Sequence, residues 1–121
     1  MKTLSYEFLE PGYKVLVVHR RLYAEDSPRF FVGTVDAFNE NSGLLRVTGH
    51  SFAPNDGGEL MRKPQPRTKV LALTSGTMIV YILPMDTDLA RLQVKRDPTG
   101  RDRLTDGKAF SLDVSEPGPD L

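Results

Sequence analysis

Residues 31–45 read FVGTVDAFNENSGLL, which is a strand containing one glycine, a polar turn and the start of a second strand. A glycine inside a strand pattern is typical of a bulge, a sharp bend or a close approach of two backbones. Small barrels use these features to coil a sheet back on itself. The segment therefore predicts a small β-barrel in which Gly33 is the hinge.

The composition fits one domain and excludes several kinds of site. Sixteen Lys and Arg balance sixteen Asp and Glu, so any electrostatic site must be local. Without cysteine the chain has no disulfide or thiolate site, which is typical of a reducing compartment. Residues 1–10 lack the apolar core of a signal peptide, and the apolar run 78–83 is far below the roughly 20 residues of a membrane span. We expect a soluble, cytoplasmic protein without membrane contact.

Hydrophobic periodicity predicts five strands preceded by a short helix. The helix covers residues 3–10, because Leu4 and Phe8 lie one turn apart before Pro11 and Gly12. The strands are predicted at residues 13–23, 29–38, 44–52, 70–73 and 78–83. The first should be buried on both faces at its start and half exposed at its basic end.

The rest of the chain predicts one long loop and a separate extension. Residues 53–67 hold three prolines and two glycines, which indicates a long loop of the kind that often carries function. Beyond Pro84, apolar residues alternate around 90–94 and 110–114, which predicts two further edge strands that bracket a loop. The predicted organisation is a barrel over residues 1–84, an extension over 85–114 and a disordered tail over 115–121.

This order of elements resembles the Sm-like (Lsm/Hfq-type) version of the SH3-type five-stranded antiparallel barrel, over residues 4–84. The first Sm motif has a glycine, an apolar residue two positions on, and an aromatic with an acidic residue at the strand end. Gly33, Val35, Phe38 and Asn39 occupy those positions and are followed by Leu44, Leu45 and Val47. The second motif is a short glycine turn followed by apolar residues, which resembles residues 75–84.

The same resemblance implies binding of single-stranded RNA, yet the residues that usually read uridine are mostly replaced. Asn39 stands at the acidic position, Asn41 at the stacking position, Gly43 at the uracil-reading position and Ser75, before Gly76, at the arginine position. Stacking, base-edge hydrogen bonds and a guanidinium are the chemistries that such a pocket needs. The standard uridine pocket is therefore not expected.

Two basic clusters are the alternative route to a nucleic acid. The first joins His19, Arg20 and Arg21 to Arg29 across a hairpin. The second consists of Arg62, Lys63, Arg67 and Lys69, and no acidic residue stands between Met61 and Met85. Both can bind phosphate. Both can also be ordinary solvated charges of a strand end and a loop.

Aromatic residues offer stacking surfaces or core packing. The pair Phe30 and Phe31, together with Tyr81 or Phe52, can stack on bases, since every base has a π face. Phe31 and Phe38 are expected in the core. Alternation places Phe30 and Phe31 on opposite faces of one strand, so one should point away from the barrel interior, and its exposure there would indicate a partner surface.

Catalysis, metal binding and cofactors are not expected. His50 and His19 are the two histidines, and Asp56 or Glu59 would have to complete a metal site. No nucleophile has an evident base, and no glycine-rich loop can cradle phosphate.

The sequence favours a non-enzymatic Sm-like homo-oligomer, a ring that binds single-stranded nucleic acid through its basic loop and pore-side residues. The expected nucleic-acid contacts are Asn39, Asn41, Ser75, Gly76, Arg62, Lys63 and Arg67. In Sm-like rings the fifth strand of one subunit pairs with the fourth of the next. The expected interface residues are therefore Val70, Leu71, Leu73, Ile79, Tyr81 and Leu83. The alternative is an SH3-like protein-interaction or structural module, favoured if residues 89–114 pair with the barrel edge and block the ring.

Overall fold

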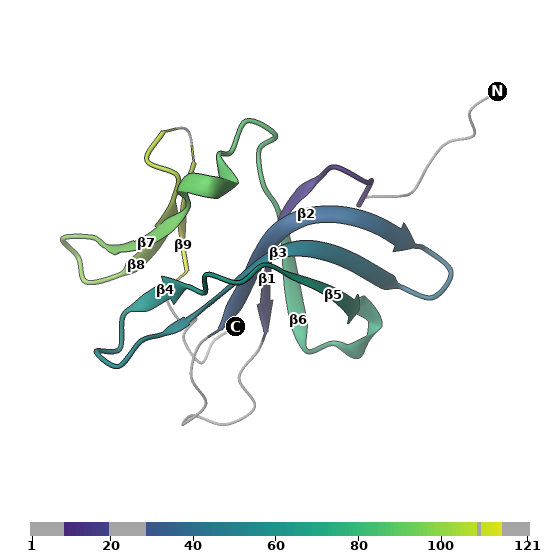
Figure 1. The fold of residues 1–121 in the computed structure, drawn as a ribbon, viewed down its shortest axis with the longest axis horizontal. Coiled ribbons are helices and arrows are strands. Elements are labelled where there is room, and N and C mark those ends of the chain that lie inside the picture. Colours follow the sequence, from purple (N-terminus) through teal and green to yellow (C-terminus); the bar gives the residue numbers. More distant parts are fainter. Residues whose placement is uncertain (1–8, 20–28, 109, 115–121) are drawn as a thin grey trace.

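The computed structural model describes residues 9–19, 29–108 and 110–114, which form two antiparallel sheets (Figure 1). The main sheet has the order β4-β3-β2-β1-β6, and β5 pairs with β3 on the same side as β4. The expected mainly β, antiparallel architecture is confirmed. The main-sheet strands are β1 (Lys14–His19), β2 (Phe30–Asn39), β3 (Leu44–Pro54), β4 (Leu60–Arg62), β5 (Arg67–Ala72) and β6 (Met78–Ile82).

The smaller sheet has the order β7-β8-β9 and lies beside β4 in Figure 1. Its strands are β7 (Gln93–Arg96), β8 (Asp102–Thr105) and β9 (Ser111–Asp113), and two short 3₁₀ helices, η1 (Leu73–Ser75) and η2 (Leu89–Arg91), flank β6 and β7. The extension was predicted to contain two strands around a loop. That is incomplete, because β8 forms inside the predicted loop between turns that contain Gly100 and Gly107.

Apolar side chains form two cores, one on each face of β1. Val15 and Val17 pack with Phe31, Val47 and other residues inside the curl of the main sheet. Leu16, on the opposite face, packs with side chains of β2 and β3 and of the smaller sheet; this second core contains Leu16, Phe30, Val32, Phe52, Leu83, Leu92 and Leu104. The predicted two-sided burial at the start of the first strand is confirmed.

Gly33 and Gly49 lie directly opposite each other in the pairing of β2 with β3. A Cβ atom on Gly33 would lie 2.3 Å from the carbonyl oxygen of Thr48, and one on Gly49 would lie 1.9 Å from that of Val32. Neither glycine has a positive φ. The close backbone approach, followed by a register shift between Val35 and Ala37, is therefore what the glycine in the strand signals.

The stretch 53–67 was predicted as one long loop, and this is wrong for its first part. β3 continues to Pro54, and β4 pairs with it through Pro54 and Leu60 after a tight turn. Asn55 builds that turn, because its side-chain oxygen accepts hydrogen bonds from the N–H groups of Gly57 and Glu59. Pro54 is tolerated because it is the last residue of its strand.

The curled sheet has two unpaired edges rather than a closed seam. Within the described residues, β5 and β6 each pair on one side only, so the closed barrel that was predicted is not seen. Of the helix predicted over residues 3–10, only Leu9 and Glu10 are described, and neither is helical. The rest of that helix, the cations Arg20 and Arg21, and the tail 115–121 lie outside the described residues.

Candidate functional site

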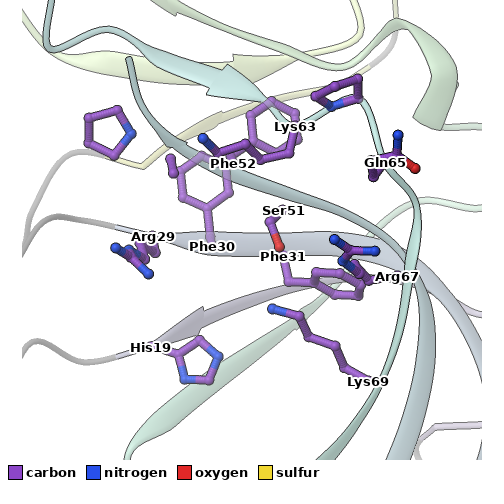
Figure 2. A pocket seen from close by; sticks show the side chains of 13 residues that line it. His19, Arg29, Phe30, Phe31, Ser51, Phe52, Lys63, Gln65, Arg67 and Lys69 are labelled. Carbon is purple, nitrogen blue, oxygen red and sulfur yellow. The ribbon is translucent and has the colours of Figure 1, made fainter. Parts of the chain in front are cut away.

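A groove of about 890 Å³ opens where the ends of β1, β2 and β3 meet the connection between β4 and β5 (Figure 2). Of the thirteen described residues that line it, five are basic and none is acidic. The basic residues are His19, Arg29, Lys63, Arg67 and Lys69. We call this surface the basic groove.

Strand pairing explains why these residues meet. β1 and β2 are antiparallel with Val18 opposite Phe30, so His19 and Arg29 follow at the same end of the hairpin. On the other side of β2, strand β3 carries β5, and Arg67 pairs with Gly49. The N–H of Lys63 donates a hydrogen bond to the carbonyl oxygen of Ser51 at 2.8 Å, which holds the connection between β4 and β5 against β3. Members of both basic clusters of the sequence thus lie in one site.

Three phenylalanine rings line the basic groove, but other side chains of the protein cover them. Phe30 stacks on Phe52 with ring centroids 5.1 Å apart. The amine of Lys69 lies 4.8 Å from the centroid of Phe31. Phe30 is 4% exposed, and Phe31 and Phe52 are each 1% exposed.

The aromatic predictions therefore have a mixed outcome. Phe30 and Phe31 do lie on opposite faces of β2, and Phe31 is a core residue as expected. The smaller sheet covers the outer face, so Phe30 is buried rather than exposed. Phe38 is partly buried against the inner core, while Tyr81 is 40% exposed on β6, outside the basic groove.

His19 contributes no full charge to the basic groove at neutral pH. Loss of solvent contact and the positive charge of Lys69 lower the pKa of His19 from its usual 6.5. Figure 2 shows the Lys69 amine on the His19 side of the groove. The permanent cations are therefore Arg29, Lys63, Arg67 and Lys69, whose charge is not offset by an acidic residue in the described lining.

Arg62 was predicted to contact nucleic acid, and the structure gives it other partners. Its guanidinium donates hydrogen bonds of 2.7–2.9 Å to the carbonyl oxygens of Leu89, Ala90 and Leu92. The same group lies 5.9 Å from the ring centroid of Phe52. Arg62 thus fastens η2 and the smaller sheet to β4, and it does not line the basic groove.

Four predicted nucleic-acid contacts come from the Sm-like comparison, namely Asn39, Asn41, Ser75 and Gly76. They lie at the end of β5 that is far from the basic groove. The Asn39 side-chain oxygen accepts hydrogen bonds from the N–H groups of Asn41 and Ser42, which shapes the turn between β2 and β3. The N–H of Leu73 donates to the carbonyl oxygen of Gly43, so η1 lies beside that turn. Ser75 belongs to η1, and Gly76 ends it with a φ of 74°.

The predicted nucleic-acid residues are therefore split between two places. β5 pairs Arg67 with Gly49 at one end and Ala72 with Leu44 at the other. Five residue steps separate these ends, or roughly 16 Å along a strand. The basic groove lies at the Arg67 end of β5. The other predicted contacts lie near the Ala72 end and include no cation; they are Asn39, Asn41, Ser75 and Gly76.

The predicted interface residues also divide. Val70 on β5 is 64% exposed, and Ile79 and Tyr81 on β6 are about 40% exposed, so these three lie on the open edges. Leu71 and Leu83 are buried core residues and Leu73 is partly buried against the inner core. These three side chains therefore pack inside the protein and are not exposed on the edges. Ile82, which is not among the predicted interface residues, is 50% exposed on β6.

The described residues contain no group of three or more His, Asp or Glu residues placed to hold a metal ion. None of their helices has the length and apolar character that crossing a membrane requires.

The chain matches no family model, no curated protein and no solved structure. The basic groove and the open sheet edges are therefore the observations that bear on function. The cations of the groove could be predicted from the sequence. Their meeting in one place could not, because it depends on the pairing of β5 with β3.

Proposed function

We propose that the protein is a non-enzymatic, oligomeric Sm-like β protein that binds single-stranded nucleic acid in the basic groove. The observation that carries this proposal is the groove itself, where four permanent cations meet and no acidic residue of the described lining opposes them. Phosphate groups are the natural ligands of such a surface, because each contact releases condensed counterions. The net charge of the chain is zero, so this concentration of positive charge is local to the groove.

The Sm-like part of the proposal is supported by the arrangement of the main sheet. β1, β2, β3, β5 and β6 provide five antiparallel strands around one apolar interior, with the last two at its open edges. In the Sm-like comparison these are the strands that pair between subunits. The exposed apolar side chains of Val70, Ile79, Tyr81 and Ile82 stand on these edges.

The smaller sheet leaves these edges accessible. Residues 93–113 pair among themselves as β7, β8 and β9, and no described residue of the extension pairs with β5 or β6. An uncovered apolar edge invites strand addition, and a second copy carries the matching edge. This favours the oligomer over the alternative of a monomeric SH3-like interaction module. Light scattering across a chromatography peak tests assembly: we expect a mass several times that of one chain, whereas a monomer would favour the interaction module.

Nucleic-acid binding is tested by fluorescence anisotropy with a labelled 12-nucleotide oligouridine at low salt. The test variant carries Lys63→Glu and Arg67→Glu, which are exposed residues of the basic groove. The matched control carries Lys95→Glu and Lys108→Glu, which make the same charge change at exposed positions outside the groove. We expect the groove variant to lose at least about tenfold in affinity and the control to lose much less. Equal losses in the two variants would contradict the proposal.

A further inference from the structure

The basic groove offers charge to a nucleic acid, but its phenylalanine rings offer no surface for the bases. Stacking on a protein aromatic requires an accessible π face. Phe30 and Phe52 cover each other's faces at 5.1 Å, and the Lys69 amine covers Phe31 at 4.8 Å. Arg62 approaches Phe52 as well, at 5.9 Å. All three rings are at least 96% buried, so no phenylalanine of the described groove can receive a base.

We infer that the basic groove recognises the sugar-phosphate backbone alone and leaves the bases in solvent, so that binding is independent of base sequence. This inference rests on the proposed function and specifies its ligand class. Contacts to phosphate position a strand without reading its sequence. The groove supplies the donors for such contacts in Arg29, Lys63, Arg67 and Lys69.

Three side chains of the lining that carry no full charge at neutral pH could in principle read a base edge, namely His19, Ser51 and Gln65. Ser51 is partly buried, whereas His19 and Gln65 are exposed. Gln65 extends from the connection between β4 and β5, as Figure 2 shows. Backbone recognition therefore predicts that His19→Ala and Gln65→Ala each leave the relative affinities for different bases unchanged.

The number of cations sets the expected salt dependence. For single strands the slope of log K against log salt is about −0.7 for each phosphate that is neutralised. Four contacts give a slope of about −2.8, and Lys63→Gln should reduce it to about −2.1. The outward bases contribute nothing to this slope or to its change.

The decisive experiment compares a labelled 12-nucleotide oligothymidine with an abasic 12-mer of the same deoxyribose-phosphate backbone, by anisotropy over a salt series. We expect the two affinities to agree within about threefold and both slopes to be near −2.8. Binding of oligothymidine with a tenfold or greater loss for the abasic strand would overturn backbone recognition and leave the proposed function standing. Failure of both oligomers to bind would overturn the proposed function and this inference with it. A change in base preference on His19→Ala or on Gln65→Ala would also overturn the inference.

Discussion

Replacing Gly49 with alanine tests whether the close approach of β2 and β3 determines the fold. The new Cβ would lie 1.9 Å from the carbonyl oxygen of Val32 and 2.5 Å from the Cα of Gly33. These are backbone atoms, so no side-chain rotation can relieve the contact. Overpacking of this kind costs about 3 kcal/mol, against which the better strand propensity of alanine returns about 0.5–1 kcal/mol. The net loss should be about 2 kcal/mol.

Urea unfolding followed by far-ultraviolet circular dichroism measures this loss. For a domain of this size, 2 kcal/mol corresponds to a midpoint lower by roughly 1 M or more. Gly57→Ala is the matched control, because its φ is not positive and its Cβ would meet only the Asn55 side-chain oxygen, at 3.5 Å. We expect that variant to stay within about 0.5 kcal/mol of the parent. A Gly49→Ala protein as stable as the parent would refute the proposed role of the glycine pair.

Three further predictions follow from individual contacts. Arg62→Met removes the hydrogen bonds to the carbonyl oxygens before β7 and should lower the free energy of unfolding by about 2 kcal/mol, with faster hydrogen exchange in β7 to β9; unchanged exchange would argue against the fastening role. The folded state lowers the pKa of His19, so its contribution to stability is present above pH 6.5 and is lost as the pH falls below that value; the urea midpoint should therefore drop more between pH 7.5 and 5 in the parent than in His19→Gln, and equal drops would contradict this. Ile79→Lys places a charge on the open β6 edge and should reduce the mass measured by light scattering, whereas Lys95→Gln on β7 should not.

The fold was predictable where local chemistry dominates. The glycine at position 33 and the apolar alternation on either side of it marked the paired strands β2 and β3. The apolar start of residues 13–23 marked a strand buried on both faces. The role of Gly49 could not be predicted, because its position opposite Gly33 is known only once the register of β2 and β3 is known. The prolines of residues 53–67 concealed β4, since Pro54 sits at a strand end where a proline is harmless.

The site was predictable in its ingredients and not in its assembly. The cations were apparent from the sequence, but the joining of His19 and Arg29 to Lys63, Arg67 and Lys69 depends on long-range strand pairing. Arg62 is adjacent to Lys63 in sequence, yet alternation along the strand end turns it toward η2. The burial of Phe30 could not be foreseen either, because it depends on the smaller sheet covering that face.

The proposed function depends most on where a nucleic acid binds. Hydrogen-deuterium exchange with mass spectrometry, with and without saturating oligothymidine, locates the contact on the intact protein in any oligomeric state. We expect slower exchange in peptides that cover residues 29–31, 49–54 and 63–69, which border the basic groove. Residues 39–43 and 73–77, at the far end of β5, should be unchanged. Slower exchange confined to those turns, with none at the groove, would contradict binding in the basic groove.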